Sequence, residues 1–168
     1  MSIKLVNPQY PTEKLHASVI DILNSTELFA MATVNSAGEC HIHAAYFCFS
    51  DDLDIFSVSD VGTIHAKNIA EVPRVAVSVF DSHQPWDSGH RGLQLFGKCW
   101  QAGLIESARG LKIHASRFKA YGEYMSAINP FERDKSPYKF FVFRPESIKI
   151  FDENEFGEET FVIADVRR

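Results

Sequence analysis

Short stretches of alternating or clustered apolar residues recur along most of the chain and predict β-strands. Turn-forming residues separate them, and the run Asn35-Ser36-Ala37-Gly38 is typical of a hairpin because glycine reaches positive φ without strain. A second turn is predicted at Arg144-Pro145-Glu146. The strands are expected at residues 28–34, 39–49, 53–58, 75–81, 92–103, 138–143 and 147–151.

Helical periodicity is confined to three segments, residues 12–24, 63–71 and 106–124. Thr12 is placed to cap the first helix, and Pro73 ends the second. Residues 128–137 are predicted to form a loop, and Gly97 within its strand indicates a bulge or a close approach of two backbones.

Six to seven antiparallel strands joined mostly by tight turns, with three helices between them, predict a mainly β fold. We expect a β-barrel with flanking helices, because no glycine-rich dinucleotide fingerprint accompanies the strand–helix–strand passage. A chain of 168 residues is the size of one domain, which predicts a single domain over residues 1–168. An extended N-terminal arm (1–11) and an acidic C-terminal tail (152–168) flank its barrel.

The composition limits the classes of binding partner and the cellular compartment that we expect. The chain is 45% hydrophobic and 23% charged, which is enough to bury a core, and its net charge of -5 without a basic stripe argues against nucleic acid. No apolar run is long enough to span a membrane and no signal peptide is evident, so a cytoplasmic protein is expected. Its three cysteines fit free thiols in a reducing compartment, and its 14 phenylalanines exceed what a core of this size needs, which indicates a ligand pocket or subunit interface.

Small hydroxylated residues ahead of the second helix form a candidate anion site. Ser57, Ser59 and Thr63 precede His65 and Lys67, which lie in the first two turns of the helix. Amide donors and the positive end of the helix dipole would meet a phosphate there. The alternative is that Thr63 serves only as a helix cap.

A histidine pair on one strand forms a second candidate site. His41 and His43 share one face of the strand, an arrangement in which two imidazoles can bind one metal ion. Cys40 faces the other way, so a third ligand would have to come from His83 or His90 through folding. Polar residues at a pocket or interface are the alternative explanation, and no metal site is assigned.

The motifs in their order resemble the pyridoxamine 5′-phosphate oxidase-like FMN-binding split barrels. The resemblance covers residues 25–151. The runs that carry it are ATVNSAGECHIHAAYF, LDIFSVSDVGTIHAKNIAEVPRVAVSVFD, RGLQLFGKCWQ and YKFFVFRPESIKIF.

This resemblance implies a homodimer that binds FMN in two clefts at the subunit interface. The strand passing the flavin, mostly through backbone contacts, would comprise His43, Ala44, Ala45, Tyr46 and Phe47. The ring or ribityl chain would be flanked by Ser57, Val58 and Ser59 and approached by Gln94. The phosphate would be held by Thr63, His65 and Lys67.

Departures from the oxidase pattern separate this chain from the true oxidase. His43 stands where the oxidase has an arginine, Cys48 where it has a lysine, and Ile64-His65 where it has an Arg-Lys pair. Gly92 replaces a flavin-contacting glutamine, and the oxidase's C-terminal tryptophan and Arg-His-rich segment are missing. The chain is therefore similar to the small bacterial members of mixed function, and oxidation of vitamin B6 is not expected.

No grouping of side chains indicates a catalytic acid, base or nucleophile, which is consistent with a cofactor that carries the chemistry. The leading hypothesis is an FMN-dependent oxidoreductase acting between a reduced nicotinamide, or a small organic substrate, and the flavin. Two alternatives stay open: a non-catalytic flavin-binding protein of stress response, and a haem- or metal-binding split barrel that uses His41 and His43.

Overall fold

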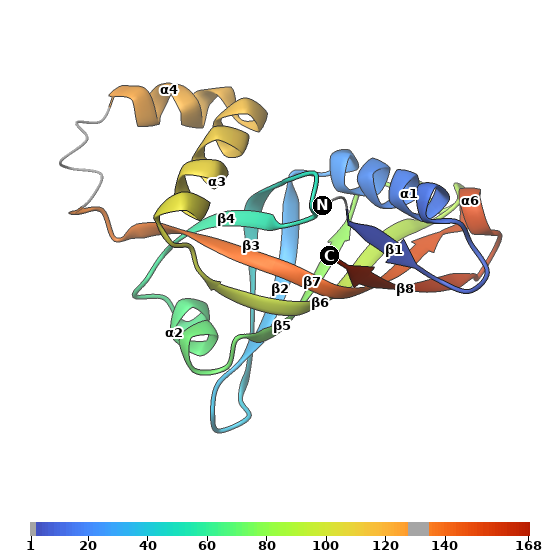
Figure 1. Ribbon diagram of the computed structural model, residues 1–168, viewed down its shortest axis with the longest axis horizontal. Helices are drawn as coiled ribbons and strands as arrows, with labels where there is room; N and C mark the ends of the chain where they lie inside the picture. Colours follow the sequence, from blue (N-terminus) through green and yellow to red (C-terminus); the bar gives the residue numbers. More distant parts are fainter. Residues whose placement is uncertain (1–2, 128–134) are drawn as a thin grey trace.

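The computed structural model describes residues 3–127 and 135–168, and antiparallel strands form its centre (Figure 1). The first half of the chain contains β1 (Lys4–Val6), α1 (Thr12–Ser25), β2 (Leu28–Val34), β3 (Cys40–Phe49), β4 (Ile55–Asp60), α2 (Ile64–Glu71) and β5 (Arg74–Phe80). The second half contains β6 (Arg91–Gln101), α3 (Leu104–Arg117), α4 (Lys119–Ala127), β7 (Tyr138–Asp152), α6 (Glu153–Phe156) and β8 (Phe161–Arg167).

The eight strands of the described residues belong to one antiparallel sheet in the order β1-β8-β7-β4-β3-β2-β5-β6, and β6 also pairs with β7. That last pairing closes the six strands β2 to β7 into a barrel, while β8 and β1 extend the sheet beyond β7. The predicted β-barrel with flanking helices is therefore confirmed. The predicted six to seven antiparallel strands agree with the six strands of the barrel, and the arm and the tail each add one further strand, β1 and β8.

β7 is one continuous strand, so the turn predicted at residues 144–146 is wrong. Pro145 lies opposite Gly97, at the point where the register between β6 and β7 shifts after Phe96. A proline has no N–H to donate, and a bulge is a place where a ladder can do without that bond. A Cβ on Gly97 would lie 2.8 Å from the Pro145 Cα. The close approach predicted for Gly97 is thus confirmed.

The two ends of the described chain lie side by side. β1 runs antiparallel to β8, with Lys4 opposite Arg167, so the arm predicted as merely extended is a paired strand. The tail forms the one-turn helix α6 and then β8. A pattern confined to neighbouring residues cannot reveal this pairing, because it joins distant parts of the chain.

The helices differ from the prediction in two places. Pro11, not Thr12, is the N-cap of α1, and the Thr12 hydroxyl donates instead to the carbonyl of Leu5. The segment expected to be one helix over residues 106–124 is two helices, because Phe118 leaves helical geometry between α3 and α4. α2 follows the prediction. Residues 128–134 of the predicted 128–137 loop lie outside the described residues.

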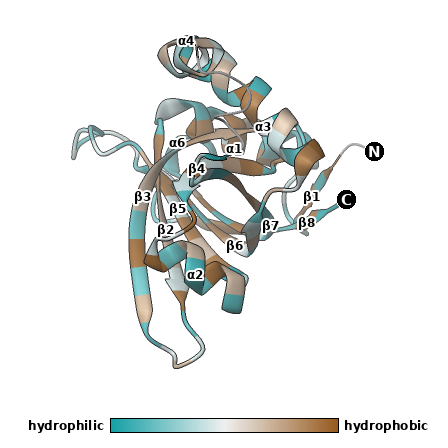
Figure 2. Cartoon of the chain, turned by 90° about the vertical axis from the view of Figure 1, so that its left-hand side faces the viewer, coloured by the Kyte–Doolittle hydropathy of each residue, from teal (hydrophilic) through white to brown (hydrophobic). Residues whose placement is uncertain are grey.

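Two apolar clusters pack on opposite sides of the barrel wall. The larger fills the barrel and reaches α1, and includes Phe47, Leu95 and Phe143. The smaller lies under α3, where Phe56 and Phe140 contact its apolar side chains. The cartoon coloured by hydropathy shows apolar and polar residues alternating along part of β3 (Figure 2).

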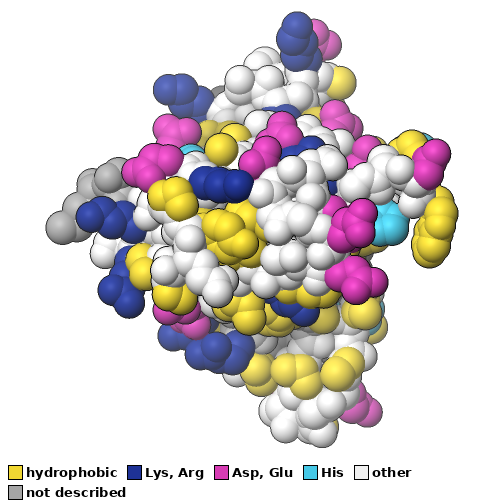
Figure 3. Space-filling view, turned by 90° about the vertical axis from the view of Figure 1, so that its right-hand side faces the viewer, with side chains coloured by type: hydrophobic (Ala, Val, Ile, Leu, Met, Phe, Trp, Pro, Cys, Tyr) yellow, Lys and Arg dark blue, Asp and Glu magenta, His cyan; other side chains and the backbone are white. Residues whose placement is uncertain are grey.

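On the side that carries α6, acidic, basic and hydrophobic side chains are intermixed at the surface (Figure 3). None of the helices in residues 3–127 and 135–168 has the length and apolar character to cross a membrane. Cys40, Cys48 and Cys99 are all free, as expected, and only Cys40 is exposed.

Candidate functional site

β3 separates from β4 halfway along its length. β3 pairs with β2 from Cys40 to Tyr46, but it pairs with β4 only from Phe47 to Phe49. On its β4 side, residues 40–46 therefore have no strand partner among residues 3–127 and 135–168, and the described sheet does not use their backbone groups on that edge. We call this opening the β3–β4 split.

Side chains alternate between two environments along β3. His41, His43 and Ala45 are partly buried on the side of α2 and the core, whereas Ile42 and Tyr46 are 69% and 56% exposed on the other side. The predicted shared facing of His41 and His43 is thus confirmed. Two chemically different surfaces result: one of imidazoles beside the split, and one of apolar side chains on the outside of the sheet.

α2 closes the end of the split. Thr63 is its N-cap, with a hydroxyl that accepts from the Ala66 N–H at 3.4 Å and donates to the Asp60 carbonyl at 2.8 Å. His65 is only 9% exposed, and its Nε2 lies 2.6 Å from Ser59 Oγ and 3.1 Å from Thr63 Oγ1. The hydroxyls predicted to hold a phosphate are therefore engaged with His65 and with the helix end.

The three histidines beside the split are arranged as a stack. The His43 and His65 rings lie 3.6 Å apart and almost parallel, and His41 lies 6.2 Å from His65, also near parallel. His43 Nδ1 is buried without a hydrogen-bond partner among the described residues. The sequence pattern identified His43 and His65 separately, but it carried no signal that a strand and a helix would bring them face to face.

Burial disfavours the charged forms of two rings of this stack, His43 and His65. It is the largest cause that lowers the pKa of His43 to about 4, and the nearby charges of His65 and His41 lower it further. The pKa of His65 is also lowered, mainly by burial and then by the proximity of His41. Of the predicted phosphate-binding side chains, only Lys67 thus supplies a positive charge, and it is exposed.

A buried hydrogen-bond chain holds the β2–β3 hairpin against α2. Asn68 Nδ2 donates to Thr33 Oγ1 at 3.2 Å, and the Thr33 hydroxyl reaches the His41 carbonyl at 3.3 Å. Both side chains are less than a tenth exposed. Their polar character at buried positions is the signal that could have marked them, since buried polar groups need partners.

The predicted site residues do not all meet at the split. Ser57 and Ser59 follow one face of β4 toward it, but Val58 faces the cluster under α3. Phe47 is fully buried in the core, and its N–H is bonded to the Glu27 carbonyl, so its side chain lines no opening.

Ala44 and Tyr46 belong to the outside of the sheet, and Gln94 lies there too, on β6. Through the register β3–β2–β5–β6, Gln94 is three strands from β3, or about 14 Å at the usual strand spacing. We call this surface the outer face. Its exposed or half-buried members include Leu28, Ala30, Ala32, Ile42, Ala44, Tyr46, Ala76, Ser78, Phe80, Gln94 and Phe96. A shallow cavity of about 240 Å³ opens in its middle.

The histidines do not form a metal-chelating set. In the described part of the chain, no three His, Cys, Asp or Glu side chains are placed to hold a metal ion together. Parallel stacking also keeps the ring nitrogens of His43 and His65 from converging on one point. His83 and His90 lie on the loop after β5, where His90 contacts Trp86, and neither completes the pair.

The six antiparallel strands β2 to β7 form a barrel, and its neighbouring strands β3 and β4 separate along part of their length. This architecture is a split barrel. The chain matches the family model described as "Pyridoxamine 5'-phosphate oxidase" over residues 15–152, and it belongs to that family. No curated protein matches it.

Solved structures share the fold at low sequence identity. A haem-binding protein from Mycobacterium smegmatis superposes with a TM-score of 0.71 and 16% identity over 93% of this chain, which spans 59% of that protein's length. HutZ, the haem storage protein from Vibrio cholerae, has a TM-score of 0.62 and 14% identity, covering 77% of this chain and 89% of its own. An FAD-binding protein from Mesorhizobium loti has a TM-score of 0.59 and 14% identity, covering 88% and 96%.

Proposed function

We propose that the protein binds FMN at the β3–β4 split and serves as an oxidoreductase between a reduced nicotinamide, or a small organic substrate, and the flavin. The observation that carries this proposal is the free backbone edge of residues 40–46, which leads to the N-terminus of α2. When bound, the flavin would supply hydride or electron transfer.

The residues at the split fit such a cofactor in two respects. Unpaired backbone donors and acceptors along β3 can bond the polar edge of a ring system, as they would bond a strand. The first amides of α2 lack intrahelical acceptors and Lys67 lies in the next turn, so an anion can be held there. Since His65 is neutral and already bonded to Ser59, the phosphate would be held by amides and one lysine.

A homodimer through the outer face would complete the site. Within one chain Gln94 is remote from the split, whereas the family arrangement places flavin sites between two subunits. The outer face exposes large apolar side chains, including Leu28, Ile42 and Phe96, of the kind that subunit interfaces cover. The homodimer is therefore part of the proposal.

The deciding experiment is reconstitution followed by absorption spectroscopy. The purified protein, titrated with FMN, is expected to bind it saturably with a perturbed flavin spectrum, and then to bleach when a reduced nicotinamide is added without oxygen. Binding without bleaching by any nicotinamide would support the non-catalytic flavin-binding alternative. Failure to bind FMN at all would refute the proposal.

Haem binding is the second candidate, and one observation favours it. His43 presents a buried Nδ1 that has no hydrogen-bond partner among the described residues, and imidazole nitrogens are common haem ligands. Two structures of similar fold are a haem-binding and a haem storage protein. The stacked arrangement fits poorly, because His65 covers the His43 ring and would have to move.

Haemin titration separates this candidate from flavin binding. A saturable Soret band that disappears in the His41→Ala/His43→Ala double variant, but persists in the His83→Ala control, would establish haem binding through the stack. The control is apt because His83 is exposed on a loop. An unchanged Soret band in the double variant would remove these histidines from consideration.

A further inference from the structure

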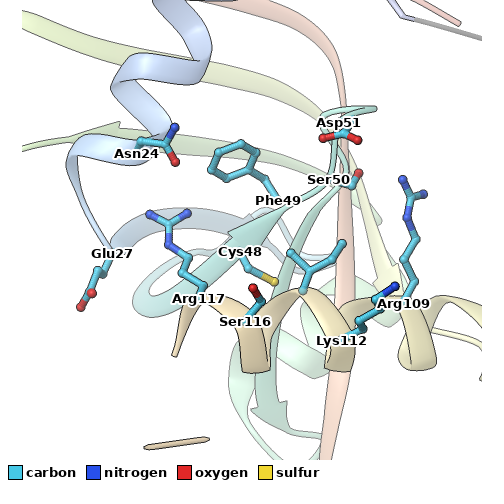
Figure 4. Close-up of a pocket in the computed structure, with 11 residues that line it drawn as sticks. Asn24, Glu27, Cys48, Phe49, Ser50, Asp51, Arg109, Lys112, Ser116 and Arg117 are labelled. Carbon is cyan, nitrogen blue, oxygen red and sulfur yellow. The ribbon is translucent and has the colours of Figure 1, made fainter. Parts of the chain in front are cut away.

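A cavity of about 740 Å³ lies between α3, the β3–β4 turn and the chain that follows α1 (Figure 4). We call it the α3 cavity. One stripe of α3 faces it and contains Arg109, Lys112, Ser116 and Arg117, whose spacing puts them on the same side of a helix. The cavity adjoins the end of β3 where β3 and β4 remain paired, so it is separate from the β3–β4 split.

Arg117 is a partly buried cation that lines this cavity. Its guanidinium lies 4.6 Å from the Phe47 ring centre and 5.4 Å from that of Phe49, and its Nη2 donates to the carbonyls of Leu23 and Thr26. Its Nη1 is buried without a partner among the described residues, and none of their carboxylates lies within ion-pair distance. Burial accordingly lowers the pKa of Arg117. Glu27 acts on Arg117 through its charge without forming an ion pair, so the guanidinium can still accept an anion.

Further donors line the same cavity. Lys112 and Ser116 form no side-chain ion pair or hydrogen bond with other described residues, and Figure 4 shows them on the stretch of α3 that leads to Arg117. Arg109, one turn before Lys112, is already paired with Asp52 at 2.8 Å. The unused positive charge is thus concentrated at Lys112 and Arg117.

The remaining wall is apolar, and the rim is acidic. Phe49, Ile113 and Cys48 supply carbon and sulfur surface, and burial raises the pKa of the Cys48 thiol to about 12, so that it is no nucleophile. Glu27 and Asp51 are exposed at the edge. The volume is in the range of pockets that enclose small organic ligands.

We infer that the α3 cavity binds an organic anion, a carboxylate or a phosphate ester, whose charged group meets Arg117, Lys112 and Ser116 and whose apolar body packs on Phe49 and Ile113. The two rim carboxylates favour a ligand that also presents a hydrogen-bond donor toward solvent, and they oppose additional negative charge there. This site is independent of the cofactor proposed at the split.

The inference is tested by NMR titration of the full chain with four probes: phenyl phosphate, benzoate, inorganic phosphate and benzyl alcohol. Phenyl phosphate and benzoate are expected to saturate, with shifts centred on α3 and the β3–β4 turn, and the stronger of the two identifies the preferred anionic group. Inorganic phosphate should bind at least about 5-fold more weakly than phenyl phosphate because it lacks the apolar body. Benzyl alcohol should not saturate because it lacks the charge.

Single substitutions test which side chains of the α3 cavity contact the bound anion. Lys112→Ala should weaken phenyl phosphate by about 5- to 10-fold, since one charge-assisted bond is lost, and Ser116→Ala by a smaller factor. Lys119→Ala is the matched control, since that lysine is exposed on α4 outside the cavity. The inference is overturned if neither aromatic anion saturates at millimolar concentration, if the shifts centre on the split, or if Lys119→Ala weakens binding as much as Lys112→Ala.

Discussion

The imidazole of His65 lies face to face with that of His43, with ring centres 3.6 Å apart and planes inclined by 11°. The stacked rings thereby place the first turn of α2 against β3 at the β3–β4 split. In a site expected to hold a phosphate, this stack replaces the positive charge of the oxidase pattern with apolar contact and hydrogen bonds to Ser59 and Thr63. In the proposed site, an anion would be held by the amides at the start of α2 and by Lys67.

Replacing Lys67 with alanine is expected to weaken FMN by about 5- to 10-fold and to leave riboflavin unchanged, because the lysine would contact only the phosphate. Fluorescence titration with both flavins measures the two constants. Lys4→Ala, another exposed lysine, is the control. Equal weakening of FMN and riboflavin by Lys67→Ala would contradict a phosphate position at α2.

Ile42→Glu is expected to convert the proposed homodimer to a monomer. Ile42 is 69% exposed on the outer face, so a glutamate there would be buried without a partner in a dimer but solvated in a monomer. Sedimentation velocity of the wild type and the variant measures the change. Ile105→Glu, at an exposed position on α3, should leave the sedimentation coefficient as it is. A wild type that sediments as a monomer would rule out the dimer.

Gly97→Ala is expected to lower the free energy of unfolding by about 3 kcal/mol, because overpacking against backbone cannot be relieved by a rotamer change. Its Cβ would collide with the Arg144 carbonyl and lie 2.8 Å from Pro145 Cα. Gly92→Ala on the same strand is the matched control, since its nearest neighbours are at an ordinary 3.4 Å. Urea unfolding of both variants compares them. Similar losses would show that close approach at the bulge is not the cause.

Arg91→Ala is expected to cost about 3–5 kcal/mol of stability, as breaking a buried ion pair leaves a charge without its partner. The Arg91 Nε lies 3.1 Å from Asp152, which is 0% exposed and also accepts from the Ser18 hydroxyl at 2.6 Å. Arg74→Ala removes a solvent-exposed pair with Glu146 and should cost less than about 1 kcal/mol. Urea unfolding at pH 7 measures both. A loss for Arg91→Ala no larger than for Arg74→Ala would contradict this role.

Protonation of His114 should lower the free energy of unfolding as the pH falls. Burial, aided by the charge of Arg117, lowers the pKa of His114 to about 4, so the unfolded chain binds a proton more readily than the folded one. The contribution is complete above the unfolded pKa of about 6.5 and is lost as the pH falls toward 4, by up to roughly 1.4 kcal/mol per pH unit.

Urea unfolding between pH 7 and pH 5 measures this dependence. His114→Phe should reduce its slope without removing it, because the new ring packs among Phe118, Tyr121 and Phe140 without titrating, whereas His43, with a pKa of about 4, still contributes. His83→Gln, at an exposed position, should leave the dependence unchanged. A variant His114→Phe with the slope of the wild type would assign the effect to other groups.

Much of the fold follows from local patterns. The β2–β3 hairpin forms where Gly38 takes φ of 84°, and α2 begins at the Thr63 cap, both as predicted. The turn predicted at Pro145 is wrong, although a proline between two strand-like runs normally indicates a turn. Here Pro145 lies at a register shift opposite Gly97, where the missing side chain permits a close approach, and only the three-dimensional register shows that partner.

The candidate site was less predictable than the fold, for a physical reason. The residue types around Thr63 indicate an anion site, but their hydrogen bonds depend on the distance between α2 and β3. At the distance observed, His65 reaches both Ser59 and His43. The sequence identified these residues and could not show that they bind one another. The α3 cavity had no local signal, because its lining comes from three distant segments.

The pairing of β1 with β8 constrains the order of assembly. Among the described strands, β1 is synthesised before all the others, yet the edge it pairs with belongs to β8, which is synthesised after them. β7 likewise must arrive before β6 can be joined and the barrel closed. Contacts so distant along the chain are slow to form. Until they do, the apolar inner faces of β2 to β6 stay open to water, and this stage of synthesis is when the protein is most exposed to aggregation.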